Sequence, residues 1–121
     1  MFGTDNSVPI YLQMAEKIKT DIISGKLSPG ERLPSVRDLA LQMKANPNTV
    51  QKSLAELEEI RLLYTERTNG KFVTENEELI KKIKEEFAHK IAEQYLSLMN
   101  NLGFGTDEAS NYLKIIGGDK N

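Results

Sequence analysis

Short polar side chains gather around one proline in the stretch 46–52, and their types suit hydrogen bonding to another molecule. The set consists of Asn46, Asn48, Thr49, Gln51 and Lys52. Amides and hydroxyls of this length can match the donor and acceptor patterns of base edges, which differ for each base pair in the major groove of DNA. Asn46 and Thr49 can equally serve only to cap and brace a helix that begins at Pro47. The stretch therefore predicts a helix start that is suited to reading bases.

Further groups that suit DNA phosphates lie on both sides of this stretch. Ser35 and Arg37 stand where another helix should begin, and the unpaired N–H groups and the dipole of a helix start favour an anion. Lys44 falls in the turn between the two helices. A later hairpin carries Arg67, Asn69, Gly70 and Lys71. Such a hairpin can flank the minor groove or its phosphates. A solvated arginine and an ordinary solvated hairpin are the alternatives.

Three helices are needed to position these groups. Apolar residues recur at helical spacing over residues 9–23, and Ser24-Gly25 ends that run with a glycine suited to a left-handed cap. A short strand or extended link follows over residues 26–34. The second helix runs from Ser35 to about Met43, and the third starts at Asn46 with the buried stripe Val50, Leu54, Leu57 and Ile60. Two helices joined by about three residues form a helix-turn-helix.

The period of the sequence changes after Arg61. Residues 62–65 and 71–74 are β-prone runs on either side of Thr68-Asn69-Gly70, and Asn-Gly is the strongest short-range signal for a hairpin. A helix-turn-helix followed at once by a hairpin predicts a winged helix. The predicted fold class is therefore mostly α with a small β-hairpin wing, followed by two C-terminal helices.

Several ordered blocks carry a resemblance to a known family. They are Pro9-Ile10-Tyr11, the run GKLSPGERLPSVRDLA over residues 25–40, Asn46-Pro47-Asn48-Thr49-Val50, and Leu57-Glu58. Together they resemble the GntR family of bacterial regulators, in its YtrA-like branch with a short C-terminal segment. The resemblance covers nearly the whole chain and implies that Arg37 contacts DNA. Two positions depart from the pattern, because the family commonly has glycine at Arg61 and near Thr68.

An apolar stripe runs along the C-terminal part. From Ile80 to Leu102 it takes six steps over 22 residues, a wider spacing than the ~3.5 of a left-handed coiled coil. Gly103 should end this helix, and Thr106 should cap a last amphipathic helix. Two such helices cannot close a core alone; they can form an intramolecular bundle or pair with a second copy, and the resemblance implies the second copy. The residues predicted at this dimer interface are Ile80, Ile83, Phe87, Ile91, Tyr95, Leu98, Leu102, Tyr112, Leu113 and Ile116.

Composition excludes several other classes. With 121 residues, 39% hydrophobic and 28% charged, the chain is an ordinary globular protein. It has neither an apolar run long enough to cross a membrane nor a secretion signal at its start, so we expect a cytoplasmic protein. It lacks cysteine and any Gly-rich turn that could cradle a nucleotide, which argues against an enzyme. With His89 as the lone histidine, we expect no metal and no cofactor. An effector could bind between two copies, but no set of polar residues indicates one.

The formal net charge of −2 is unusual for a DNA-binding protein. Residues 1–75 are balanced, with six lysines and four arginines against three aspartates and seven glutamates, so the acidic excess lies in residues 76–121. We therefore expect a DNA-binding domain over residues 1–75 and a helical dimerisation segment over residues 76–121. The predicted function is a homodimeric transcription regulator, a repressor that binds double-stranded DNA at an inverted-repeat operator. The alternative is a winged-helix protein-interaction module without DNA binding.

Overall fold

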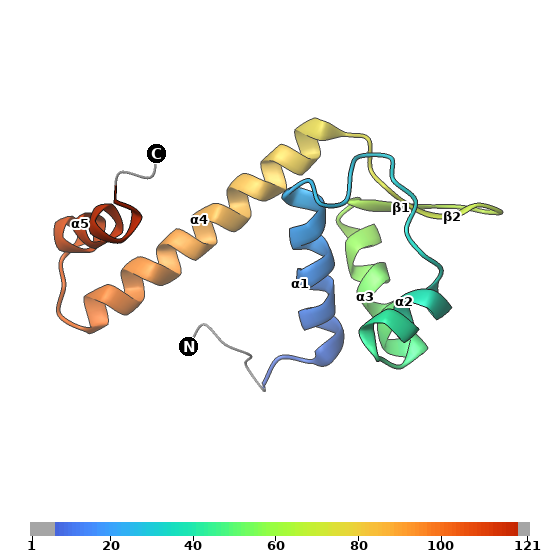
Figure 1. The fold of residues 1–121 in the computed structure, drawn as a ribbon, viewed down its shortest axis with the longest axis horizontal. Coiled ribbons are helices and arrows are strands. Elements are labelled where there is room, and N and C mark those ends of the chain that lie inside the picture. Colours follow the sequence, from blue (N-terminus) through green and yellow to red (C-terminus); the bar gives the residue numbers. More distant parts are fainter. Residues whose placement is uncertain (1–6, 119–121) are drawn as a thin grey trace. The chain divides into compact units, whose positions relative to one another are not determined.

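The computed structural model describes residues 7–118, which form five helices and one two-stranded antiparallel hairpin (Figure 1). The elements are α1 (Ile10–Ile23), α2 (Val36–Met43), α3 (Pro47–Glu59), β1 (Leu63–Glu66), β2 (Gly70–Val73), α4 (Glu77–Asn101) and α5 (Thr106–Gly117). The predicted fold class is confirmed. The chain divides into two compact units, one ending at Lys84 and one beginning at Glu85, and the division falls inside α4.

The core of the first unit lies between α1 and α3, which run side by side in Figure 1. Ile22 of α1 and Leu54 and Leu57 of α3 are almost completely buried. Burial of such side chains contributes roughly 1.5–3 kcal/mol each relative to exposure, so this contact contributes several kcal/mol to the stability of the unit. Ile60, predicted to continue the stripe of α3, is instead 39% exposed, because the helix ends at Glu59.

Side-chain caps define where α2 and α3 begin. The Ser35 hydroxyl accepts a hydrogen bond from the Asp38 N–H at 3.1 Å. The Asn46 Oδ1 accepts one from the Asn48 N–H at 2.8 Å, and Pro47 takes the first helical position. Each cap satisfies an N–H that has no partner within its own helix. The predicted helix starts are therefore confirmed.

The end of α3 places an arginine in the left-handed region. The Arg61 N–H donates to the Glu58 carbonyl at 3.0 Å and the Leu62 N–H to the Leu57 carbonyl at 2.9 Å. This pair of bonds is the Schellman motif, which requires a left-handed residue and usually uses glycine. Arg61 takes that role with φ 66°, as Lys44 does after α2 with φ 52°. The glycine missing from the family pattern at Arg61 therefore does not prevent this turn.

The wing is a hairpin with a third segment along its outer edge. In β1 and β2, Leu63 lies opposite Val73 and Glu66 opposite Gly70. These strands begin and end one residue nearer the loop than predicted, although the Thr74 N–H still donates to the Leu62 carbonyl at 2.9 Å. The predicted extended link reaches β2 as well, since the Leu33 N–H donates to the Lys71 carbonyl at 2.8 Å. The segment before α2 is therefore hydrogen-bonded to β2 and stabilises the wing.

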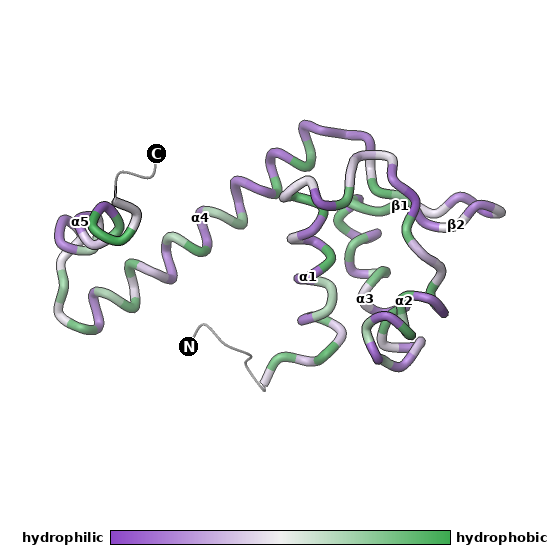
Figure 2. Tube along the Cα trace, in the orientation of Figure 1, coloured by the Kyte–Doolittle hydropathy of each residue, from purple (hydrophilic) through white to green (hydrophobic). Residues whose placement is uncertain are grey.

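The second unit consists of the rest of α4 and α5. Polar and apolar residues alternate along α4 in Figure 2, as in an amphipathic helix. Gly103 (φ 96°) ends α4, with the Phe104 N–H donating to the Met99 carbonyl at 3.0 Å, so the predicted glycine cap is confirmed. The predicted cap at Thr106 is wrong. Gly105 holds the cap position with extended backbone and donates its N–H to the Glu108 carboxylate at 3.0 Å, which makes Thr106 the first helical residue.

The left-handed arginine predicts a stabilising substitution. Arg61→Gly should raise the free energy of unfolding by up to about 1 kcal/mol, because glycine adopts positive φ without the steric cost of a Cβ. Arg61→Ala is the matched control, since it also removes the side chain but retains the Cβ. Urea denaturation followed by circular dichroism would compare the two variants. A glycine variant that is no more stable than the alanine variant would contradict this account.

Candidate nucleic-acid interface

The start of α3 presents a polar face to solvent. Because Val50, Leu54 and Leu57 are buried, the helical period places Asn48 and Gln51 on the opposite, exposed face. The side chains of Asn48 and Gln51 form no hydrogen bond with other residues in the described part of the chain. Their donors and acceptors are therefore available to a partner.

The two neighbours of this polar face have structural roles as well. Asn46 is exposed, but its side-chain oxygen caps α3, so the capping role that the sequence suggested is confirmed for this residue. Thr49 is half-buried, and its carbonyl accepts a hydrogen bond from the buried Ser53 hydroxyl at 3.0 Å. Since Ser53 also donates to the Tyr11 carbonyl at 2.7 Å, the start of α3 is fixed against α1.

Lys52 extends the polar face toward α1. Its ammonium lies over the Tyr11 ring, 5.7 Å from the ring centre. The negative face of an aromatic ring attracts a cation at this distance, which restrains a side chain that would otherwise be mobile. Lys52 remains exposed, so Tyr11 orients the charge without removing it from solvent.

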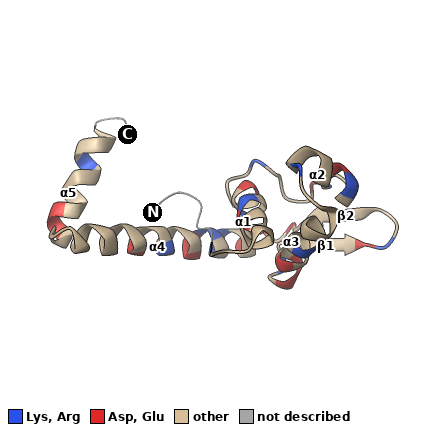
Figure 3. Ribbon diagram, turned by 90° about the horizontal axis from the view of Figure 1, so that it is seen from below, with Lys and Arg blue, Asp and Glu red and all other residues tan. Residues whose placement is uncertain are grey.

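Arg37 stands in the first turn of α2. The Ser35 hydroxyl is occupied by its cap bond, whereas Arg37 is exposed and has no hydrogen bond or ion pair within residues 7–118. A helix start carries partial positive charge, so an anion near Arg37 would meet both the dipole and the guanidinium. Lys44, at the other end of α2, is also exposed. Figure 3 shows basic residues on α2 and in the wing loop, each with an acidic neighbour, and a larger group of acidic residues on α3.

The wing residues differ from one another in their contacts. Arg67 is exposed in the loop, and Asn69 donates through Nδ2 to the Glu66 carboxylate at 3.2 Å. Gly70 has φ 97°, and a Cβ built there would lie 3.4 Å from Nε of Arg32. Arg32 was not predicted as a site residue, although its backbone bridges to β2 and its guanidinium lies against the wing. Arg32 lies within the family motif over residues 25–40, and that motif is the feature of the sequence that could have indicated its role.

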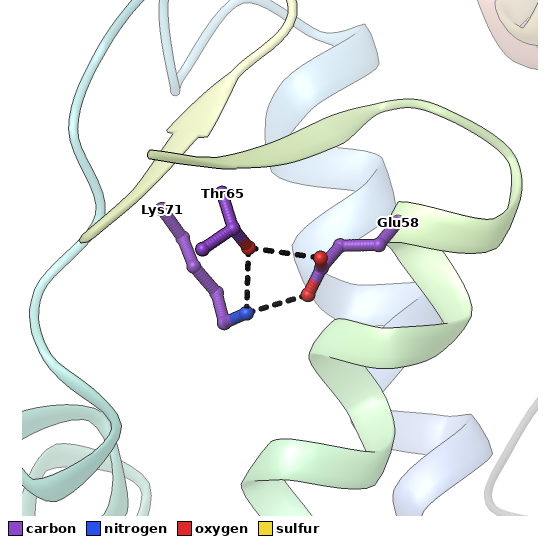
Figure 4. Close-up of polar contacts among 3 residues, drawn as sticks. All are labelled: Glu58, Thr65 and Lys71. Carbon is purple, nitrogen blue, oxygen red and sulfur yellow. Dashed lines mark hydrogen bonds and ion pairs between the residues drawn. The ribbon is translucent and has the colours of Figure 1, made fainter. Parts of the chain in front are cut away.

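Lys71 has two partners within the chain. Its ammonium lies 2.5 Å from the Glu58 carboxylate and 3.0 Å from the Thr65 hydroxyl, which in turn donates to Glu58 at 2.9 Å (Figure 4). Glu58 and Thr65 were not predicted as part of the site. The hairpin pattern alone places Thr65 opposite Lys71. Glu58 stands in the family block Leu57-Glu58, but no pattern in the sequence predicts its contact with the hairpin.

The ion pair changes the acidity of Glu58. Burial raises the pKa of its carboxyl, but hydrogen bonds from Lys71 and Thr65 together with the charge of Lys71 outweigh burial, so the pKa is lowered overall. A lowered pKa in the folded state means that ionised Glu58 stabilises the fold above its unfolded pKa. That stabilisation is lost as the pH falls through the folded pKa.

The residues predicted for dimerisation divide between the two units. Ile83 is 8% exposed and belongs to the core of the first unit, with Ile80 packed against it, so neither presents much surface to a second copy. Tyr95 is half-buried and donates to the Ala109 carbonyl at 2.7 Å, a contact between α4 and α5. Phe87 is also half-buried. The exposed members are Ile91, Leu98, Leu102, Tyr112, Leu113 and Ile116.

The described residues contain neither a cluster suited to a metal ion nor a membrane-spanning helix. No group of three or more histidine, cysteine, aspartate or glutamate side chains there could hold a metal ion. His89 is exposed on α4, with Nε2 3.5 Å from the Glu93 carboxylate. None of the described helices has the length and apolar character needed to cross a membrane.

Related proteins match over much of the chain. YhcF of Bacillus subtilis, an uncharacterized HTH-type transcriptional regulator, is 37% identical over 103 residues, covering 85% of each chain. The HTH-type transcriptional repressor YtrA of the same organism is 44% identical over 71 residues, which cover 59% of this chain and 55% of YtrA.

Solved structures agree with these sequence matches. A GntR family transcriptional regulator from Listeria monocytogenes superposes with a TM-score of 0.85 at 37% identity, covering 92% of this chain and 97% of that one. The AraR DNA-binding domain in complex with operator ORR3 superposes with a TM-score of 0.54 at 30% identity, covering 61% of this chain and 89% of that one.

A protein-family model identifies the family that these relatives share. The model for bacterial regulatory proteins of the gntR family matches residues 10–73, from the start of α1 to the end of β2. The match therefore contains the helix-turn-helix, the wing and every residue predicted to contact DNA. The chain belongs to the GntR family of DNA-binding transcription regulators, in which the YtrA-like branch fits its relatives, and it is not an enzyme.

Proposed function

We propose that this regulator is a repressor that binds an inverted-repeat operator as a homodimer. The observation that carries the proposal is the exposed start of α3, where the Asn48 and Gln51 side chains are unengaged within the described chain and Arg37 of α2 is equally available. Polar groups at such a helix start can read bases, while a cation at the preceding helix contacts phosphate and sets the register. Chromosomal DNA as the target implies a cytoplasmic protein.

Relatives support the repressor assignment and the mode of binding. YtrA is named a repressor, and the AraR domain was solved on its operator. The matches cover 59% of this chain for YtrA and 61% for the AraR domain. The alternative, a winged-helix module that binds protein only, does not account for the unengaged polar side chains of Asn48, Gln51 and Arg37 at the starts of α3 and α2.

A second copy is proposed from the apolar surface of the second unit. Ile91, Leu113 and Ile116 lie within residues 85–118, and each is more than half exposed. Burying such side chains against a two-fold related copy removes apolar surface from water, with roughly 25 cal/mol gained per Å². The proposed interface consists of the exposed residues Ile91, Leu98, Leu102, Tyr112, Leu113 and Ile116. Of the residues predicted from the sequence, it leaves out Ile80 and Ile83, which pack in the first unit, and the half-buried Phe87 and Tyr95.

Selection of bound fragments from a random pool of double-stranded DNA tests the proposal. Two recognition helices related by a two-fold axis should select an inverted repeat whose half-site centres lie about 10 base pairs, or a multiple of one helical turn, apart. In the same selection, Asn48→Ala should relax the base preference at one symmetric pair of positions by roughly 1–3 kcal/mol. A pool without enrichment, or one with the same preference for both proteins, would contradict base reading by α3.

Arg37→Ala should weaken binding to the selected operator by about 1.5 kcal/mol, which is roughly tenfold, because it removes a charge-assisted hydrogen bond to phosphate. Fluorescence anisotropy at one fixed salt concentration measures the effect. Lys26→Ala is the matched control, since it removes a positive charge from the exposed loop after α1. Equal operator affinities for the two variants would contradict the assignment of Arg37 as a DNA contact. Circular dichroism would check that both variants are folded.

Ile91→Asp and Leu113→Asp should each convert the dimer to monomers, because a carboxylate inside an apolar interface has no partner. Light scattering coupled to size exclusion gives the mass in solution. Ser97→Asp, at an exposed polar position of the same helix as Ile91, is the control that should remain dimeric. If the dimer persists in both apolar variants, the second copy binds elsewhere.

A further inference from the structure

Three side chains join the wing to the end of α3 in a closed triangle of hydrogen bonds. Glu58 comes from the last turn of α3, Thr65 from β1 and Lys71 from β2 (Figure 4). Lys71 donates to Glu58 and Thr65, and Thr65 donates to the second oxygen of Glu58. Every member of the triangle therefore contacts both of the others.

The register of the hairpin directs Lys71 toward α3. Thr65 lies opposite Lys71, one pair nearer the loop than Tyr64 and Phe72 and two pairs from the base of the hairpin. Side chains alternate between the faces of a strand, so Thr65 and Lys71 share the face of the buried Leu63 and Val73. The rings of Tyr64 and Phe72 stack on the other face, 5.6 Å apart.

The partial burial of the ion pair makes it costly to break. The Lys71 and Glu58 side chains are 24% and 32% exposed, respectively. A phosphate that attracted Lys71 would have to displace a carboxylate already in contact and leave Glu58 without its cation. Arg67 faces no such competition, because it is exposed in the loop just beyond the triangle.

We propose that Glu58 is the positioning residue of the wing, and that Lys71 braces the hairpin on α3 instead of contacting phosphate. This replaces the expectation from the sequence that Lys71 contacts DNA. The triangle joins the hairpin to α3 two residue pairs from the base of the hairpin, so it restrains the position of the loop that carries Arg67. The inference rests on the proposed function for its effect on operator binding, but the brace itself exists in the free protein.

Hydrogen exchange of the free protein tests the brace. Glu58→Ala and Lys71→Met should each increase the exchange rate of amides in residues 63–73 by about fivefold, because the hairpin opens more often. Glu59→Ala is the matched control, since Glu59 is an exposed neighbour with no partner among the described side chains. Unchanged exchange in both variants would overturn the proposal. If Glu58→Ala does not fold, Glu58→Gln, which keeps an acceptor oxygen, takes its place with a smaller increase expected.

Operator affinity tests the positioning role, and the sign of the effect is decisive. Removing an acidic residue near DNA should strengthen binding by simple electrostatics, as we expect for Glu59→Ala. We expect Glu58→Ala to weaken binding about threefold, Lys71→Met to weaken it similarly, and the double variant to be no weaker than either, because both act on one unit. Tighter binding by Glu58→Ala together with weaker binding by Lys71→Met would show that Glu58 competes with phosphate for Lys71, and the proposal would fall. If no operator is selected at all, the proposed function fails while hydrogen exchange still decides the brace.

Discussion

The packing of α3 on α1 is the constraint on which the rest of this structure depends. Val50, Leu54 and Leu57 turn one face of α3 into the core, and the helical period then fixes which side chains remain outside. The buried Ser53 hydroxyl adds a directional bond to the Tyr11 carbonyl, which an apolar contact could not supply. Asn48 and Gln51 are consequently exposed because their neighbours are buried, and the proposed base reading follows from core packing.

Local charge explains how a chain with a net charge of −2 can have a basic face. Figure 3 shows basic residues on α2 and in the wing loop, with single acidic residues beside them, and a group of acidic residues on α3. Glu58, the acidic residue of α3 that contacts the wing, forms an ion pair with Lys71, so its charge is partly compensated within the fold. Long-range attraction depends on such local fields more than on the sum over the chain.

The helix ends show how the same geometry can be built from unusual residues. Arg61 and Lys44 both hold left-handed backbone at places where glycine is the common choice. At Arg61 the buried Leu62 that follows is completely inside the core, so the favourable burial offsets the local steric cost. The wing therefore begins at the same sharp turn that a glycine would allow.

The order of elements and their starts were predictable from the sequence, because they depend on short-range patterns. Helical spacing predicted α1 to α5, the Asn46-Pro47 pair located the start of α3, and Asn69-Gly70 predicted the hairpin. Ile60 and Thr106 were misassigned, since a helix end shifts easily by one residue when several neighbours can take the terminal role. Tertiary structure alone decided that Ile83 belongs to the core of the first unit and that Lys71 pairs with Glu58. Glu58 and Lys71 are 13 residues apart, and their contact depends on the angle at which the hairpin leaves α3, which no local pattern encodes.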